Sequence, residues 1–212
     1  MSLKLYLVRH GETIYSKTGS YCGEIDPELT ADGLLMAEQL AAAYQSHPWT
    51  AAFVSPMKRT IATAKPLCES LGLEMQLRDG LKEIRYGQWE DKTPEYVSQH
   101  YAEDYQHWLT EPAWNPPTGG ETAVQIASRA SLVIAEIQER YEAGNVLVVS
   151  HKATIRVILC SLLGIDLGSY RNRIAALAAS VNVVKFDVRG PMLEVLGDRS
   201  HLDDRLRALA GT

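Results

Sequence analysis

Two segments of the chain, 5–13 and 146–154, repeat one pattern, and this repeat limits the possible folds more than any other feature of the sequence. Each segment has four apolar residues, one polar residue, a histidine and, three places later, a threonine. Short apolar runs of this kind are typical of buried parallel strands. Neighbouring parallel strands place their carboxyl ends at one edge of an open α/β sheet, where ligands bind. If these two strands are neighbours, as the pattern indicates, His10 and His151 meet at that edge.

The rest of the chain alternates predicted strands and helices. The predicted strands are 3–8, 51–54, 73–77 and 146–149, with an antiparallel edge hairpin formed by 181–188 and 192–196. The predicted helices run from a cap at Thr30 to about 46, from a Ser55-Pro56 start to about 71, and over about 121–142 and 153–163. This alternation predicts an α/β fold, a three-layer αβα sandwich with a mainly parallel central sheet.

The segment 84–120 differs in composition from its surroundings. It is rich in tryptophan and tyrosine, and it ends in the run Pro116-Pro117-Thr118-Gly119-Gly120. We interpret it as a small cap inserted into one domain that spans residues 1–212. Aromatic caps exclude water and shape pockets, but the same side chains could equally form the small core of the cap itself.

Composition excludes several classes of function. The formal net charge is -5 and no basic stripe is present, which argues against a nucleic-acid partner. No apolar run approaches the ~18 residues of a membrane span, and the first residues lack a signal-peptide pattern. The three cysteines are far apart, which favours a reducing compartment. We expect a cytoplasmic protein, either a monomer or a homodimer.

A third strand end adds cations to the same edge of the sheet. The strand 51–54 is followed by a predicted helix start and then by Arg59. Helix N-termini present free N–H groups and a positive dipole end, which bind anions. Arg9 precedes His10, and guanidinium groups suit the oxygens of a phosphoryl group better than ammonium groups do. The sequence therefore predicts a phosphate-binding site at this edge of the sheet.

Other phosphate-processing motifs are absent from the sequence. No cysteine is followed six places later by an arginine, and there is no G-x-x-x-x-G-K loop or carboxylate-rich metal motif. We expect chemistry that needs no cofactor.

The run Leu7-Val8-Arg9-His10-Gly11-Glu12-Thr13 resembles the signature of the histidine phosphatase superfamily, which has the phosphoglycerate-mutase-like fold. Further segments resemble landmarks of this family and occur in the same order: 29–33, 55–60, Glu83 before Tyr86-Gly87, 119–122 and 149–151. The resemblance therefore covers nearly the whole chain. It favours the phosphatase branch of the family.

The resemblance implies a role for each residue of the phosphate site. His10 would be the nucleophile that forms a phosphohistidine. Arg9, Arg59 and His151 would hold the phosphoryl oxygens. Glu83 would protonate the leaving oxygen and then activate water. Three other carboxylates compete for this last role: Glu12, Glu90 and Asp91.

Three further residues are candidate contacts of the substrate or its phosphate. Ser16 stands where many members carry an asparagine that contacts phosphate, and it is shorter. Gly23 is a second candidate phosphate-binding residue. Lys152 follows the second histidine where many members have a small residue. It could reach the outer part of the substrate or simply point to solvent.

The resulting hypothesis is a phosphatase that hydrolyses a small-molecule phosphate monoester such as a phosphoserine or a sugar phosphate. One alternative is a phosphoglycerate-type mutase, and others are a non-catalytic phosphoanion-binding module or a phosphatase of phosphoproteins. Mutase members place an arginine directly after the catalytic acid, whereas Ile84 follows Glu83 here. The segment between Tyr86 and Gly120 also contains no arginine to clamp a carboxylate. Hydrolysis is therefore favoured over transfer.

Overall fold

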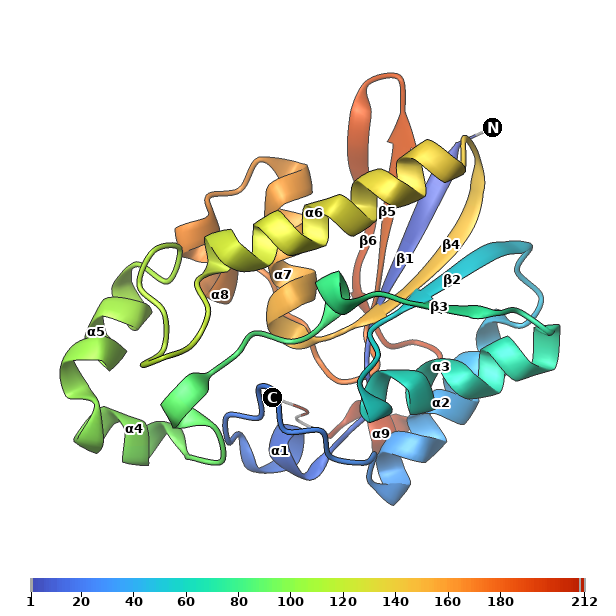
Figure 1. Cartoon of the computed structure of the whole chain (residues 1–212). Helices are drawn as coiled ribbons and strands as arrows, with labels where there is room; N and C mark the ends of the chain where they lie inside the picture. The colour runs from blue at the N-terminus through green and yellow to red at the C-terminus, as the bar shows by residue number, and fades with distance from the viewer. Residues whose placement is uncertain (1, 210, 212) are drawn as a thin grey trace.

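The computed structural model describes residues 2–209 and 211, and it shows a six-stranded sheet between two layers of helices (Figure 1). The strands are β1 (Leu3–Arg9), β2 (Trp49–Val54), β3 (Met75–Leu77), β4 (Gly144–Ser150), β5 (Val181–Asp187) and β6 (Gly190–Asp198). Their order is β3-β2-β4-β1-β5-β6. The first four strands are parallel, and β5 and β6 form an antiparallel hairpin at the edge. The predicted fold class and the edge hairpin are confirmed.

The two strands of the sequence repeat are neighbours. β1 and β4 pair in parallel, with Leu5 opposite Val146 and Arg9 opposite Ser150. The His10 amide continues this ladder by donating to the Ser150 carbonyl at 3.1 Å. The register of the pairing is the register of the sequence repeat, and the two histidine rings lie 5.2 Å apart between centroids.

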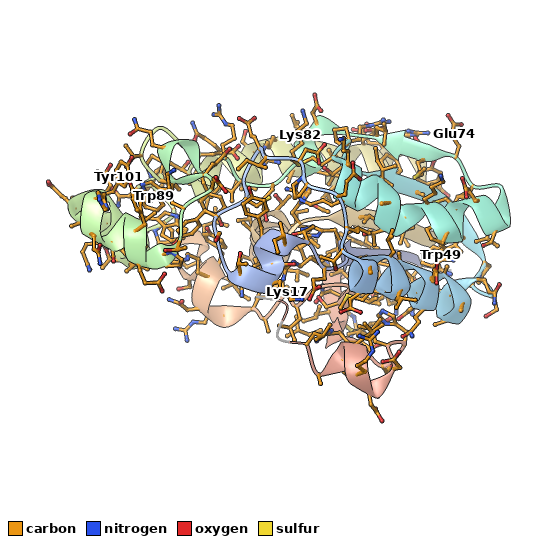
Figure 2. The ribbon with its side chains drawn as sticks, turned by 90° about the horizontal axis from the view of Figure 1, so that it is seen from below. Lys17, Trp49, Glu74, Lys82, Trp89 and Tyr101 are labelled. Atoms are coloured by element: carbon orange, nitrogen blue, oxygen red, sulfur yellow. The ribbon has the colours of Figure 1, made fainter. Side chains whose placement is uncertain are left out.

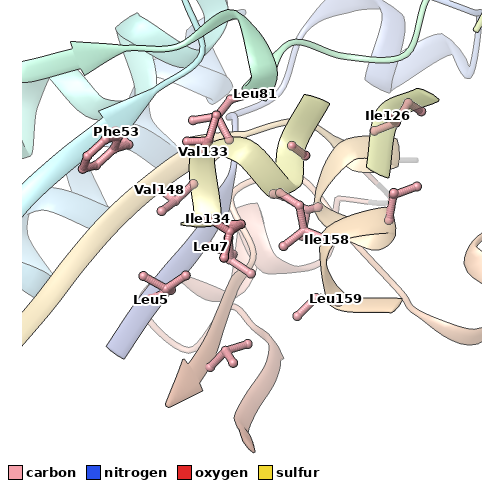
Figure 3. Packing of buried hydrophobic residues seen from close by; sticks show 14 of the residues in the cluster. Leu5, Leu7, Phe53, Leu81, Ile126, Val133, Ile134, Val148, Ile158 and Leu159 are labelled. Carbon is pink, nitrogen blue, oxygen red and sulfur yellow. The ribbon is translucent and has the colours of Figure 1, made fainter. Parts of the chain in front are cut away.

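Helices cover both faces of the sheet. They are α1 (Ile14–Thr18), α2 (Ala31–Tyr44), α3 (Lys58–Leu71), α4 (Pro94–His100), α5 (Ala102–Thr110), α6 (Ala123–Arg140), α7 (Lys152–Leu163), α8 (Tyr170–Arg173) and α9 (Asp204–Arg207). Side chains alternate along each strand. Leu7 and Val148 therefore face α6 and α7, in the packing drawn in Figure 3. Leu147 and Val149 face the opposite layer of α2 and α3.

The helix α3 begins later than the sequence predicts. Ser55 was expected as its cap and Pro56 in its first turn, but the helix starts at Lys58 after Met57. The reason is that Ser55 still belongs to the sheet edge, where its amide donates to the Val149 carbonyl at 3.0 Å. The helix start is fixed instead by Asp26, whose carboxylate accepts from the Lys58 amide at 2.9 Å.

The segment 84–120 contains α4 and α5, which lie to one side of the sheet in Figure 1. Its Trp89 and Trp108 are buried and pack with Tyr21, which comes from the loop after α1. In Figure 2, Trp89 and Tyr101 lie together at the end of the molecule opposite Trp49. The aromatic residues thus form a small core here, while the division of the chain into a domain and a cap stays a prediction.

None of the helices in the described part of the chain is both long and apolar enough to span a membrane.

Candidate active site

A cavity of about 120 Å³ lies where β1 and β4 end. Six residues predicted for the site line it: Arg9, His10, Ser16, Arg59, Glu83 and Lys152. The two remaining predicted residues, His151 and Gly23, lie behind the Arg59 side chain and contact it directly. The structure therefore brings all eight predicted residues to one place.

The His10 ring is oriented by the backbone of the next residue. Its Nδ1 atom lies 2.8 Å from the Gly11 carbonyl oxygen. A carbonyl only accepts, so Nδ1 carries the proton and Nε2 keeps its lone pair. Burial, followed by the charges of Arg59 and Arg9, holds the pKa of His10 well below its ordinary value. The ring is thus neutral at neutral pH, as a nitrogen nucleophile must be.

The His151 ring is completely buried and is held at both nitrogens. Its Nδ1 accepts from Nε of Arg59 at 3.2 Å. Its Nε2 therefore carries the proton and donates to the Ser55 hydroxyl at 2.8 Å. Burial, then the charge of Arg59, lowers the pKa of His151. In this arrangement His151 orients Arg59, and its direct contact with a phosphoryl group stays a prediction.

The Arg59 guanidinium is locked by the loop that contains Gly23. Nη1 donates to the Ile25 carbonyl at 2.8 Å and Nη2 to the Gly23 carbonyl at 3.1 Å. Gly23 has a φ of 55°, in the left-handed region that favours glycine. A Cβ atom added there would also clash with the Glu90 carboxylate. Gly23 thus shapes the loop that holds Arg59, and its contact with phosphate stays a prediction.

The Arg9 side chain is also fixed by backbone acceptors. Its Nη1 donates to the Ala176 carbonyl at 2.6 Å and to the Gly211 carbonyl at 2.8 Å. Burial lowers the pKa of Arg9 to about 10, which leaves the guanidinium charged at neutral pH. Two buried arginine cations therefore reach the cavity in set positions, and such fixed charges stabilise a phosphoryl group effectively.

Glu83 is the one of the four competing carboxylates that lines the cavity. Its Oε1 accepts from the amides of Ile84 at 3.0 Å and Ala153 at 3.1 Å, so the start of α7 holds it in place. Glu12 instead accepts from the Thr30 hydroxyl at 2.8 Å, away from the cavity. The other two bind neighbouring segments: Glu90 accepts from the amides of Glu24 and Tyr86, and Asp91 accepts from the Tyr15 hydroxyl.

Ser16 and Lys152 both line the cavity. The Ser16 hydroxyl accepts from the Thr13 amide at 2.8 Å and donates to the Thr13 carbonyl at 3.0 Å, closing the first turn of α1. Lys152 begins α7 and lines the cavity, and its contact with substrate stays a prediction. Burial, then the charges of Arg9 and Arg156, lowers the pKa of Lys152 to about 8.

Several residues of the site do not follow from the sequence motifs. The Ser55 hydroxyl partners His151, and the Thr63 hydroxyl accepts from the Gly11 amide at 2.9 Å. Tyr21 and Tyr86 line the cavity from the aromatic cluster. The position of Ser55 directly after a predicted strand could have indicated that it lies at the site. The other residues reach the site only through the packing of distant segments. Across residues 2–209 and 211, no group of three or more His, Cys, Asp or Glu side chains is arranged to hold a metal ion.

The comparison with known families agrees with this geometry. Residues 5–199 match the family model described as the histidine phosphatase superfamily (branch 1). The chain belongs to the histidine phosphatase superfamily. The family that the sequence motifs indicate is thereby confirmed.

Individual members of the histidine phosphatase superfamily are similar over most of the chain. Phosphoserine phosphatase 1 of Hydrogenobacter thermophilus is 32% identical over 202 residues, which are 95% of this chain and 95% of that protein. An adenosylcobalamin/alpha-ribazole phosphatase of Escherichia coli is 30% identical over 162 residues, 76% of this chain and 80% of that protein. A solved histidine-to-alanine variant of a phosphoserine phosphatase from Entamoeba histolytica, in complex with phosphoserine, has a TM-score of 0.83 and 25% identity, and the match covers 95% of this chain and 100% of that one. These names confirm the predicted enzyme class, phosphoric monoester hydrolase, at the level of the family.

Proposed function

We propose that this chain hydrolyses a small-molecule phosphate monoester through a phosphohistidine formed on His10. The observation that carries the proposal is the convergence of His10, two arginines and Glu83 on one small cavity. Phosphoserine, a sugar phosphate or a comparable ester is the proposed substrate class. The names of the similar phosphatases support this range.

The first step transfers the phosphoryl group to the enzyme. The lone pair on Nε2 of His10 attacks phosphorus while the bond to the leaving oxygen breaks. Arg9 and Arg59 offset the charge on the phosphoryl oxygens, and their fixed positions avoid reorganisation during the reaction. Glu83 acts as the general acid and donates a proton to the leaving oxygen, so that an alcohol departs.

The second step returns the enzyme to its starting state. The Glu83 carboxylate takes a proton from water, and the hydroxide oxygen attacks the phosphorus of the phosphohistidine. The P–N bond breaks, its electron pair returns to His10, and inorganic phosphate leaves. Glu83 is again protonated and His10 is again neutral, so the cycle needs no metal or redox cofactor.

Hydrolysis of p-nitrophenyl phosphate in the presence of a chelator tests this proposal. We expect turnover by the wild type and a loss of roughly 10³-fold or more in His10→Ala, because the nucleophile is removed. His107→Ala is the matched control, because His107 is an exposed histidine in α5. Turnover that survives in His10→Ala, or a wild type inert on this ester and on a panel of phosphometabolites, contradicts the proposal.

A further inference from the structure

A second cavity of about 170 Å³ adjoins the first on the side of α7 and α8. The two cavities share four lining residues, which are Gly19, Tyr21, Tyr86 and Lys152. A substrate whose phosphoryl group sits beside His10 would extend its leaving group toward this second cavity. The residues there are consequently in a position to select the substrate.

Three cations line the second cavity. They are Lys152 and Arg156 from successive turns of α7, and Arg171 from α8, which packs against α7. No Asp or Glu is present among the described residues that line it. Three positive side chains with no negative one form a site for an anion.

None of these three cations is paired directly with a carboxylate in the described part of the chain. Lys152, Arg156 and Arg171 make no side-chain hydrogen bond and no ion pair with residues 2–209 or 211. Nε of Arg156 is buried and has no acceptor there. Buried donors are nearly always paired in proteins, so an orphaned guanidinium nitrogen beside a cavity indicates an acceptor supplied from outside.

The Arg171 guanidinium is held in place by an aromatic ring. Its central carbon lies 3.6 Å from the centroid of the Trp108 ring, which is itself buried. Stacking on a ring occupies the flat face of the guanidinium and leaves the in-plane N–H groups to donate elsewhere. Trp108 also lines the second cavity. It therefore presents a preoriented arginine fork to whatever the cavity binds.

We propose that this second cavity is a subsite for an anionic group, a carboxylate or a second phosphate, on the leaving-group part of the substrate. This inference rests on the proposed function, because it places the scissile phosphoryl group beside His10. It assigns Lys152, Arg156 and Arg171 as specificity-determining residues. The segment 86–120 has no arginine to bind such an anion, and in this proposal cations from α7 and α8 bind it instead.

Pairs of esters that differ only in the second charge test the subsite. For a carboxylate, the pair is 3-phosphoglycerate and glycerol 3-phosphate; for a phosphate, it is fructose 1,6-bisphosphate and fructose 1-phosphate. We expect at least one ester that carries the second charge to exceed the partner that lacks it by about tenfold or more in kcat/KM, the size of one charge-assisted hydrogen bond. In Arg171→Ala and in Lys152→Met the ratio for that pair falls toward unity. The control variant Arg173→Ala, an exposed arginine on the same short helix, keeps the ratio.

Binding of the same four esters to the His10→Ala variant, measured by calorimetry, tests the subsite separately from the proposed hydrolysis. A binding preference for the charged member without any turnover by the wild type supports the subsite and contradicts the proposed hydrolysis. Turnover in which neither pair discriminates, or a ratio that Arg171→Ala and Lys152→Met both leave unchanged, overturns the subsite. If one ester pair shows the preference in both calorimetry and kinetics, that pair identifies the anion: the phosphoglycerate pair indicates a carboxylate, and the fructose phosphate pair indicates a second phosphate.

Discussion

The first cavity, beside His10, and the second cavity, beside α7 and α8, form the inner and outer ends of one continuous site, and they hold their arginines in different ways. At the inner end, the Arg59 guanidinium donates to two backbone carbonyls and to His151, and Arg9 donates to two further carbonyls. At the outer end, Arg156 and Arg171 have no hydrogen-bond acceptor among the described residues. The comparison indicates that the groups proposed for chemistry are fixed before substrate binds. The groups proposed for selection gain their hydrogen-bond acceptor only when the substrate binds.

The largest effect that sharpens this comparison is expected at Glu83. Glu83→Gln removes the proton donor and should lower kcat for glycerol 3-phosphate by roughly 10³-fold. The loss on p-nitrophenyl phosphate should be smaller in the first step, because nitrophenolate leaves without a proton. A pre-steady-state burst of nitrophenolate should therefore appear in the variant, since hydrolysis of the phosphoenzyme then limits the rate.

The matched control for Glu83→Gln is Glu90→Gln, at a carboxylate that binds the amides of Glu24 and Tyr86. We expect the control to retain most of the wild-type kcat. Equal losses in the two variants would show that the proton donor has been assigned to the wrong carboxylate.

A pair of arginine-to-lysine substitutions tests the two ends directly. Arg59→Lys keeps the charge but loses the fork that bonds to the loop and to His151. We expect its kcat/KM to fall by about 10²-fold. Arg171→Lys keeps a cation over the Trp108 ring, and we expect a loss below about fivefold with 3-phosphoglycerate. If the two variants lose equal activity, the contrast between the two ends of the cavity is wrong.

A smaller effect should come from the titration of Lys152. Its pKa is lowered to about 8 by burial and by neighbouring cations, so it loses its proton and its charge as the pH rises through about 8. The groups that act on its charge are Arg9, Arg156, Glu83 and Arg171. The tyrosines that share its cavity have raised pKa values because they are buried, and they stay neutral in this range: Tyr21, Tyr86 and Tyr170.

We therefore expect KM for 3-phosphoglycerate to rise severalfold from about pH 7 to about pH 9, because one charge of the subsite is lost. KM for glycerol 3-phosphate should change less, and Lys152→Met should flatten the difference between the two esters. A pH profile of the difference that is the same in wild type and Lys152→Met would exclude Lys152 from the subsite.

The last prediction concerns mutase activity, which we expect to be absent. A bound phosphoglycerate would lose its phosphoryl group to water, because the chain lacks both the arginine after Glu83 and any arginine between Tyr86 and Gly120. Phosphorus NMR of a mixture with 3-phosphoglycerate should show inorganic phosphate and no 2-phosphoglycerate. Appreciable interconversion of the two phosphoglycerates would favour the mutase alternative.

The same comparison explains what could be predicted from the sequence. The inner residues His10, Arg9 and Arg59 follow directly from strand ends and one helix start, and parallel pairing of β4 with both β1 and β2 brings them together. Local motifs therefore sufficed. The role of Ser55 as a partner of His151 was missed, because Ser55 was assigned to a helix cap and in fact remains at the end of the sheet.

The outer end was not accessible from local patterns. Arg171 lies in a four-residue helix without a sequence signal, and its place over Trp108 depends on how the segment 84–120 packs against α7 and α8. Arg156 looks like an ordinary polar position in an apolar helix. Only the packing of three distant segments shows that these cations share one cavity with Lys152.

The most direct test of the central claim is to trap the phosphorylated enzyme. The wild type is mixed with a labelled phosphate ester, quenched in alkali, in which phosphohistidine is stable, and mapped by peptide mass spectrometry. The account predicts one acid-labile phosphoryl group on the peptide that contains His10, and none in His10→Ala. A phosphoryl group on another residue, or turnover with no phosphoenzyme and with inversion at a chiral phosphorus, would contradict it.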